Sequence, residues 1–192
     1  IRFFRMQHVL EKDKAYPPLL GQTAVDIIVP IYNGLEYFDK LFAGIEKTRM
    51  AYRLLLVDDN SPDPNVREYL EQYAASDSRV ILLRNEKNMG FLPSVNKALA
   101  MVENHVALVN TDVEVPEEWL ERLMLPILTK DRVATSTPFT TCGTICSFPN
   151  FCEDNPIFEG MQLHEIDDVF RTVKPQYPVM PTGIGFCMGM RS

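Results

Sequence analysis

The sequence predicts an α/β domain with a mostly parallel central sheet flanked by helices. Short, continuous apolar runs alternate with longer segments in which apolar residues recur every three or four positions. The former are typical of strands buried on both faces, and the latter of amphipathic helices. Strand, loop and helix follow one another in this order along the chain up to Asp112, which is the pattern of a parallel sheet.

The first two predicted strand–helix units lie in the first part of the chain. The stretch VDIIVPIYN, residues 25–33, is a β-branched run that ends in a turn-forming Asn-Gly pair. Apolar residues at helical spacing then predict a helix over 35–45. The second strand covers 54–57, two acids and a Pro-rich loop follow it, and a helix over 66–73 comes next.

The next unit repeats this arrangement. A third strand over 80–83 is followed by a polar loop and a helix over 93–102. The apolar part of HVALVNTD, which begins at His105, is the fourth strand. A further helix is predicted over 117–128, with Pro116 before it and a buried stripe of Trp119, Leu123 and Ile127.

Polar residues follow each of the four predicted strands. The carboxyl ends of parallel strands lie on one edge of a sheet, and ligands of such sheets bind beyond that edge. We therefore expect four segments to converge on one rim: Tyr32-Asn33, Asp58-Asp59, Asn85 to Gly90, and Asn110 to Asp112.

Several function classes lose support because their motifs are absent. The loop VPIYNG after the first strand is not GxGxxG, and the sequence contains neither GxxxxGK[ST] nor G-x-S-x-G. The net charge of -7 argues against a general nucleic-acid binder. The rim instead offers carboxylates and amides, which tolerate a bound diphosphate only if a divalent cation such as Mg²⁺ or Mn²⁺ lies between them.

Each polar segment also has a purely structural interpretation when it is taken alone. Asp58 to Ser61 fits a strand-to-helix turn, because Asp, Asn and Ser favour turns and helix caps. Residues 112–118 fit acids placed near a helix N-terminus. The convergence of four strand ends favours a binding site over these interpretations.

The region after Thr129 lacks clear periodicity. Residues 135–181 are predicted to form irregular loop and short strand around a substrate. We expect the phenylalanines of this region to form a local core rather than a sugar-stacking platform, and the alternative that a few of them line the acceptor side stays open: Phe139, Phe148, Phe151 and Phe158. Its cysteines, Cys142, Cys146 and Cys152, lack the paired spacing of a zinc site.

Four stretches, VDIIVPIYNG, LLLVDDNSPD, NEKNMGFLPSVNKAL and ALVNTDVEVPEEWL, resemble in this order the GT-A-fold inverting glycosyltransferases of the family-2 type, which use nucleotide sugars. The terminal PTGIGFCMGMRS resembles a later family motif more weakly. The resemblance implies a lead-in over 1–23 from a preceding region, a nucleotide-sugar-binding half over 24–128, and the start of an acceptor-side half over 129–192 in a chain truncated at its C-terminal end.

The resemblance also implies roles for the matching residues. Pro30, Tyr32 and Asn33 would contact the nucleotide, with Tyr32 against the base. The pair Asp58-Asp59 would bind base and ribose. Residues 88–90, including Asn88 and Gly90, would pass close to ribose and diphosphate.

The metal position falls on the last of the four stretches. Asn110, Thr111 and Asp112 match the DxD motif of the family, in which the last acid, here Asp112, binds the metal. Asn110 departs from that pattern and weakens the negative charge at the metal, although an asparagine oxygen can still accept a hydrogen bond or a metal contact. The general base of the family lies after the terminal motif, so it is expected beyond Ser192.

The implied activity is metal-assisted transfer of a sugar from a nucleoside-diphosphate sugar to a glycan or lipid-linked acceptor, as in cell-surface polysaccharide biosynthesis. A cytoplasmic location is expected, with membrane association through other parts of a parent protein. Two alternatives remain open at this point: a fragment that binds nucleotide sugar without turnover, and a sugar nucleotidyltransferase. The latter would want a Gly-rich, basic loop after the first strand, which VPIYNG is not.

Overall fold

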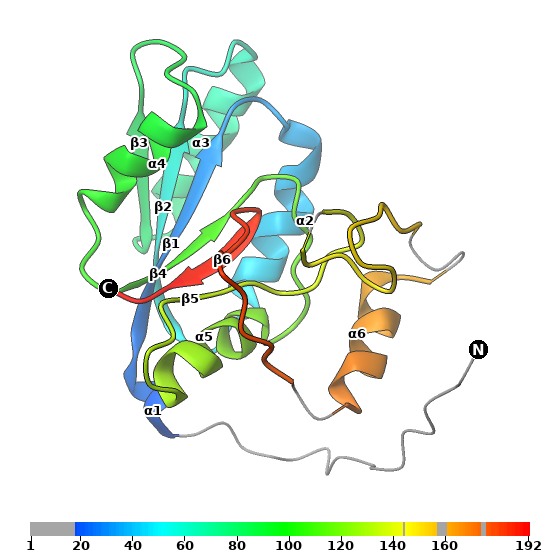
Figure 1. Ribbon diagram of the computed structural model, residues 1–192. Coiled ribbons are helices and arrows are strands. Elements are labelled where there is room, and N and C mark those ends of the chain that lie inside the picture. Colours follow the sequence, from blue (N-terminus) through cyan, green and yellow to red (C-terminus); the bar gives the residue numbers. More distant parts are fainter. Residues whose placement is uncertain (1–17, 144, 157–160, 174–175) are drawn as a thin grey trace.

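The computed structural model describes residues 18–143, 145–156, 161–173 and 176–192 (Figure 1). These residues form one six-stranded sheet of order β3-β2-β1-β4-β6-β5. The strands are β1 (Ala24–Ile31), β2 (Ala51–Asp58), β3 (Val80–Arg84), β4 (His105–Val109), β5 (Thr135–Ser136) and β6 (Cys187–Met190). The helices are α1 (Pro18–Gln22), α2 (Leu35–Glu46), α3 (Pro64–Ser76), α4 (Phe91–Leu99), α5 (Trp119–Thr129) and α6 (Leu163–Arg171).

The sheet is mostly parallel, as predicted. β1 pairs in parallel with β2 and β4, and β2 pairs in parallel with β3. β6 runs antiparallel to β4, and β5 runs antiparallel to β6. Because β5 is reversed twice relative to β4, its carboxyl end lies on the same edge of the sheet as the carboxyl ends of β1 to β4.

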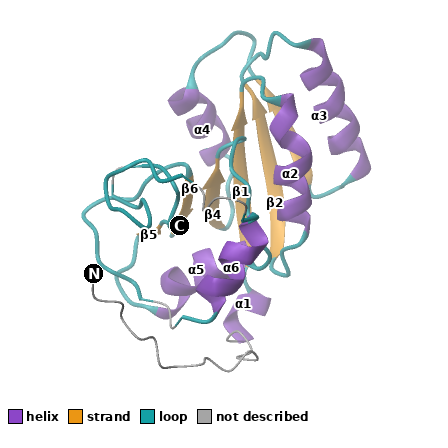
Figure 2. Cartoon of the chain, turned by 90° about the vertical axis from the view of Figure 1, so that its right-hand side faces the viewer, coloured by secondary structure: helices purple, strands orange, loops and turns teal. Residues whose placement is uncertain are grey.

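Helices cover both faces of the sheet, with α4 on one face and α2 and α3 on the other (Figure 2), and an apolar core lies on each face. On one face, Ile27 and Val29 of β1 belong to a core with residues of α2, α3 and α5. On the other face, Ile28 packs in a smaller core with Val95 and Ala98 of α4. Alternate residues of β1 thus face opposite layers, which explains why the strand is apolar throughout.

One buried charge stabilises the edge of the sheet opposite the predicted rim. Asp26 of β1 is fully buried and accepts hydrogen bonds from Arg53 Nε at 2.8 Å and Arg53 Nη2 at 2.7 Å. It also accepts from the backbone N–H of Glu103 at 2.7 Å, just before β4. Burial alone would raise the pKa of Asp26, but the hydrogen bonds from Arg53, Asn104 and Glu103 lower it to about 2. This carboxylate therefore links three neighbouring strands.

The part of the chain after α5 differs from the prediction in two ways. The first is α6, a helix within the region expected to be irregular loop and short strand. The second concerns the phenylalanines expected to form a local core, because Phe139, Phe148 and Phe151 are 56%, 38% and 60% exposed. Phe158 lies outside the described residues. Within the parts that the structure describes, no helix has the length and hydrophobicity to cross a bilayer.

Candidate functional site

The loops after β1 and β4 meet at the carboxyl edge of the sheet. Asn33 and Gly34 both adopt left-handed backbone conformations, with φ of 59° and 81°, and turn the chain sharply into α2. A Cβ atom at Gly34 would lie 3.3 Å from the Tyr37 ring and 3.8 Å from Thr111 Oγ1. The 3.8 Å separation from Thr111 is an ordinary contact distance, so the loops after β1 and β4 lie against each other, and it is the positive φ that favours glycine at this position.

The first nucleotide-contacting residues of the prediction lie at this edge. Pro30 is the penultimate residue of β1 and pairs with Val57. Tyr32 directly follows the strand, and its side chain is 53% exposed, so its ring is free to meet a ligand. Asn33 donates its backbone N–H to Ser61 Oγ at 3.0 Å and thereby joins the loops after β1 and β2.

Asp58 ends β2 with a buried carboxylate that already has protein partners. Its Oδ1 accepts the backbone N–H of Ser61 at 2.9 Å, which forms the turn after the strand. Its Oδ2 lies 3.3 Å from Nε of Arg84, at the end of β3. Asp58 therefore stabilises the turn after β2, as the structural interpretation predicts. Its carboxylate also lies at the carboxyl edge of the sheet, where the binding site was predicted.

Asp59 organises the loop after β3. Its Oδ1 accepts from Asn85 Nδ2 at 2.7 Å and from the backbone N–H of Met89 at 2.8 Å, and its Oδ2 accepts from the backbone N–H of Gly90 at 2.7 Å. Burial would raise the pKa of Asp59, but these donors together with Ser94 hold it below its usual value. The carboxylate is ionised at neutral pH and fixes residues 85–90 next to β2.

The loop that Asp59 holds lines an open hollow of about 550 Å³. Gly90 has φ of 85°, and a Cβ there would meet no atom within 4 Å, so the backbone faces open space. Asn88 is exposed, and its Oδ1 accepts the Gly90 N–H at 3.1 Å. Basic side chains line the hollow as well, namely Arg84, Lys87 and Lys97. The net-negative chain thus has a locally basic hollow beside the two aspartates.

The segment Asn110 to Asp112 lies at the end of β4, in the middle of the sheet. The Asn110 N–H donates to the Phe186 carbonyl at 2.8 Å, whereas the Asn110 Oδ1 is buried and has no hydrogen-bond partner among the described residues. A buried oxygen without a donor is uncommon in proteins and indicates an unfilled interaction. Asp112 is exposed, and within the described parts of the chain its carboxylate makes no ion pair.

These oxygens fit a hard divalent cation that is completed by its ligand. In the described ranges, no three His, Cys, Asp or Glu side chains converge into a metal site. Mg²⁺ in proteins commonly takes one or two carboxylates together with substrate phosphates rather than a full set of side chains. Asp112, with the free Oδ1 of Asn110 close by in sequence, suits that mode of binding.

Glu114 does not lie at the start of a helix. The purely structural interpretation of residues 112–118 places acids there, but α5 begins only at Trp119. The carboxylate of Glu114 instead pairs with Lys40 of α2 at 3.2 Å. Both side chains are exposed, so the pair contributes little to stability.

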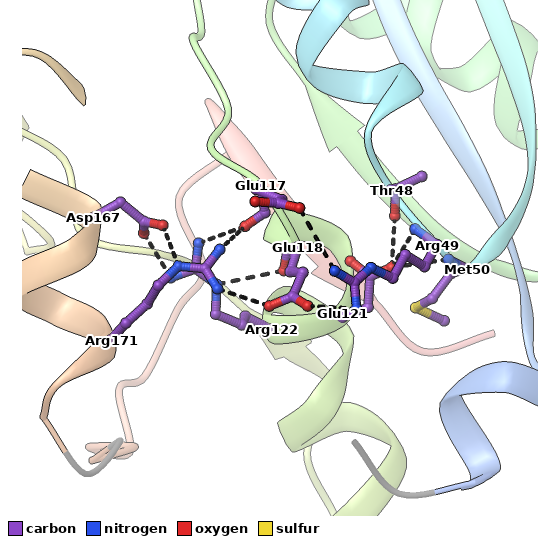
Figure 3. Close-up of polar contacts among 9 residues, drawn as sticks. All are labelled: Thr48, Arg49, Met50, Glu117, Glu118, Glu121, Arg122, Asp167 and Arg171. Carbon is purple, nitrogen blue, oxygen red and sulfur yellow. Dashed lines mark hydrogen bonds and ion pairs between the residues drawn. The ribbon is translucent and has the colours of Figure 1, made fainter. Parts of the chain in front are cut away.

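A group of charged residues that the sequence analysis missed joins α6 to the start of α5 (Figure 3). Asp167 accepts from Arg122 Nη1 at 2.7 Å and from Arg171 Nε at 2.8 Å. Arg171 Nη1 also pairs with Glu118 at 2.8 Å, and Arg49 pairs with the other oxygen of Glu118 at 3.1 Å. The two helices are therefore connected through alternating positive and negative groups.

A second buried acid, Glu121, fixes α5 to the turn between α2 and β2. Its Oε1 accepts from Thr48 Oγ1 at 3.0 Å and from the backbone N–H groups of Arg49 and Met50 at 2.6 and 2.8 Å (Figure 3).

One signal for α6 was present in the sequence, because Leu163, Ile166 and Phe170 follow helical spacing. No sequence signal indicated that Asp167 would face Arg122.

Comparison with known proteins agrees with this architecture. One relative is TuaG of Bacillus subtilis, whose name describes it as a putative teichuronic acid biosynthesis glycosyltransferase. It is 30% identical to this chain over 100 residues, which are 51% of this chain and 39% of that protein. The mannosyltransferase PcManGT from Pyrobaculum calidifontis, solved with GDP-Man and Mn²⁺, superposes with a TM-score of 0.56 and 19% identity over 68% of this chain and 39% of that one. The structure of S. aureus TarS 1-349 with UDP-GlcNAc superposes with a TM-score of 0.52 and 20% sequence identity. The match covers 61% of this chain and 34% of that one.

These likenesses cover only part of the relatives, because the chain matches 39% of the length of TuaG. The two solved structures support the fold. The sequence profile described as Glycosyl transferase family 2 matches residues 26–192, nearly the whole described chain. The chain belongs to glycosyl transferase family 2 and has the GT-A fold that the order of its motifs predicts.

Proposed function

We propose that this chain is the donor-binding part of an inverting glycosyltransferase that takes a nucleoside-diphosphate sugar and, with Mg²⁺ or Mn²⁺, transfers its sugar to a glycan or lipid-linked acceptor. The observation that carries the proposal is the segment Asn110 to Asp112. At the end of the central strand β4 it presents a buried oxygen that has no donor, and an exposed carboxylate that makes no ion pair, among the residues that the structure describes.

The order of the strands supports a single orientation of the donor. The basic hollow and the two aspartates lie after β3 and β2, and Asp112 lies after β4. A nucleoside-diphosphate sugar is linear, with base, ribose, diphosphate and sugar in sequence. The nucleoside therefore belongs beside Asp58, Asp59 and residues 88–90, with Tyr32 against the base, and the diphosphate belongs next to Asp112.

The role of each polar group follows from this orientation. A bound cation would be held by Asp112 and the Asn110 amide oxygen, and would supply positive charge to the diphosphate as it leaves. In this orientation Thr111 would lie beside the diphosphate, and the backbone of Gly90, which faces open space, would lie beside the ribose. Asp59 acts through the loop that it holds, because it accepts hydrogen bonds from Asn85, Met89 and Gly90 of that loop.

Calorimetric titration with UDP, GDP and dTDP, each with and without Mn²⁺, tests the proposal. We expect at least one diphosphate to bind, and to bind more tightly with the metal. The printed names of the related structures differ in nucleotide, GDP in one and UDP in the other, so the panel must contain both. The proposed function is wrong if no diphosphate binds and if Asp112→Ala leaves the titrations in the presence of metal unchanged.

A second measurement separates transfer from binding alone. If a diphosphate binds but neither donor hydrolysis nor transfer is detected, the chain is a nucleotide-sugar-binding fragment without turnover. Formation of a nucleotide sugar from a sugar phosphate and a nucleoside triphosphate would instead indicate a nucleotidyltransferase. The chain matches about two fifths of TuaG, so the same assays on a full-length protein complete the comparison.

A further inference from the structure

Phe139 and Phe148, which the prediction placed in a core, instead form a partly exposed aromatic cluster with Phe170 of α6. The ring centroids of Phe139 and Phe148 are 5.7 Å apart, those of Phe148 and Phe170 are 5.1 Å apart, and those of Phe139 and Phe170 are 6.2 Å apart. All three separations are typical of aromatic rings in mutual contact. Phe139 and Phe148 are 56% and 38% exposed, so the cluster has ring surface available to a ligand.

The cluster lies on the same edge of the sheet as Asp112. Asn110 at the end of β4 donates its N–H to the Phe186 carbonyl, and two residues earlier the Ile184 N–H donates to Thr137 Oγ1 at 3.1 Å. Thr137 directly follows β5, whose carboxyl end shares this edge. Phe139 comes two residues after Thr137, on the side of Asp112 away from the nucleoside.

The rings are held by buried polar contacts rather than by a mobile loop. Asn155 is buried and donates its Nδ2 to the carbonyls of Thr141, Asn150 and Glu153 at 3.2, 2.9 and 2.9 Å. The Phe148 N–H donates to the Thr140 carbonyl at 2.9 Å. The loop that carries two of the rings is thereby fixed at several points.

The third ring comes from α6, which the charged group of Figure 3 fixes in place. Phe170 stands beside Arg171 and three residues after Asp167, and both of these pair with residues at the start of α5. The segment that follows the metal position and the segment that carries Phe170 are thus connected by ion pairs. The cluster has a defined position relative to Asp112.

We infer that Phe139, Phe148 and Phe170 form a platform for the sugar ring of the acceptor, an inference that rests on the function proposed above. In a linear donor the sugar to be transferred lies beyond the diphosphate, so the acceptor approaches from the side opposite the nucleoside. The aromatic cluster lies on that side. Exposed aromatic surface beside a polar site is typical of ligand-binding regions.

The surroundings of the rings favour a sugar over a lipid chain or a protein. A pyranose ring has an apolar C–H face and a periphery of hydroxyl groups, so it needs a flat apolar surface with polar groups around it. The described residues of the loop that carries Phe139 and Phe148 include exposed polar groups: Thr141, Asn150, Glu153 and Asp154. A lipid tail would bind more favourably to a surface without these carboxylates and amides, because covering them with an apolar chain would remove their hydrogen bonds to water.

Spectra of the chain with ring-¹³C-labelled phenylalanine test the inference. Methyl glycosides of glucose, galactose, rhamnose and N-acetylglucosamine are titrated as probes, and decyl phosphate is titrated as the lipid alternative. We expect at least one glycoside to shift the resonances of Phe139, Phe148 and Phe170. A shift by decyl phosphate and by none of the glycosides overturns the inference.

Substitutions separate stacking from apolar contact. Phe148→Leu and Phe139→Leu should each weaken glycoside binding about three- to tenfold, whereas Phe148→Tyr keeps the ring face and should stay within about twofold. Met101→Ala is the matched control, because Met101 is 44% exposed but lies before β4 at the opposite edge of the sheet. Equal affinity of Phe148→Leu and wild type, in a variant with an unchanged melting temperature, refutes the platform.

The diphosphate titration, repeated on the same variants, distinguishes the two proposals. If diphosphates bind with Mn²⁺ and no glycoside shifts the rings, the platform is wrong and the proposed function stands. If glycosides bind through the rings and no diphosphate binds, the function proposed for the other end of the rim is wrong. Both binding events are expected, and diphosphate affinity should be the same in Phe148→Leu as in wild type.

Discussion

Replacing Asp59 with asparagine tests whether this carboxylate holds the loop after β3 or remains available to a ligand. The side chain is only 4% exposed and accepts hydrogen bonds from the Asn85 amide and from two backbone N–H groups, those of Met89 and Gly90. An asparagine has nearly the same shape but only one accepting oxygen. Its NH₂ group would face the Gly90 N–H, which then keeps only its 3.1 Å contact with Asn88 Oδ1, or, in the flipped orientation, the Met89 N–H, which then loses its acceptor.

The contacts set the size of the effect. Loss of the Asp59 acceptor by one backbone donor, with an NH₂ group facing that donor instead, costs about 1–3 kcal/mol, and the remaining hydrogen bonds lose the added strength of an ionised acceptor, about 1 kcal/mol more. We therefore expect Asp59→Asn to lower the free energy of unfolding by about 2–4 kcal/mol. In a domain of this size that corresponds to a melting temperature lower by roughly 5–15 °C.

Thermal unfolding followed by circular dichroism at pH 7 measures the effect. Asp112→Asn is the matched control on the same edge of the sheet, since Asp112 is exposed, and it should change stability by less than about 0.5 kcal/mol. Because the folded-state pKa of Asp59 lies below its usual value, the gap between wild type and Asp59→Asn should narrow as the pH falls below about 4. A variant that melts with the wild type at pH 7 would show that Asp59 does not hold the loop.

Three further predictions concern the scaffold and the acceptor side. Asp26→Asn should lower the free energy of unfolding by about 2–3 kcal/mol at pH 7, because Arg53 loses a buried ionised partner. Since the pKa of Asp26 is about 2 in the folded protein against 3.8 ordinarily, urea unfolding should find a smaller difference at pH 3 than at pH 7, and an equal difference would contradict this reasoning. Gly44→Ala should destabilise the fold by about 1–3 kcal/mol in the same assay. The added Cβ would lie 2.6 Å from Val115 Cγ2 and 2.7 Å from the carbonyl oxygen of that residue. An unchanged stability would mean that the segment around Val115 moves aside at no cost. Asp167→Asn should speed amide hydrogen exchange in α6 and weaken glycoside binding with diphosphate affinity unchanged, and unaltered exchange would show that the ion pairs do not hold the helix.

The parallel part of the sheet could be predicted because its signals are local. Continuous apolar runs such as that of β1, buried on both faces, and amphipathic helices such as α2 follow from burial alone. Parallel pairing then brings the ends of the strands to one edge, so the positions of Asp58, Asp59 and Asp112 on the rim follow from the chain order.

The part after α5 was less predictable because it depends on contacts between distant segments. The helix α6 has nine residues, and its charged side chains pair with residues more than forty positions away, such as Arg122 with Asp167. The exposure of Phe139 and Phe148 likewise depends on a loop folded around Asn155. Hydrophobicity alone favours a core position for such rings, and only the tertiary arrangement places them at the surface.

The hydrogen-bond partners of Asp58 and Asp59 within the protein could not be predicted from the sequence either. The motif VDDN indicates two carboxylates at a strand end, but it does not say which groups will donate to them. The structure shows Asp58 joined to Ser61 and Arg84, and Asp59 joined to the loop that ends at Gly90. Direct contact of either carboxylate with a nucleoside stays a prediction.

Paramagnetic broadening by Mn²⁺ tests the central claim most directly, namely that the end of β4 holds a metal together with a diphosphate. In ¹⁵N-labelled chain that is saturated with the best-binding nucleoside diphosphate, substoichiometric Mn²⁺ should selectively broaden the amide resonances of Asn110, Thr111 and Asp112. The same addition to Asp112→Asn should leave them sharp. Broadening centred on another part of the described chain, or broadening that persists unchanged in Asp112→Asn, would contradict the account.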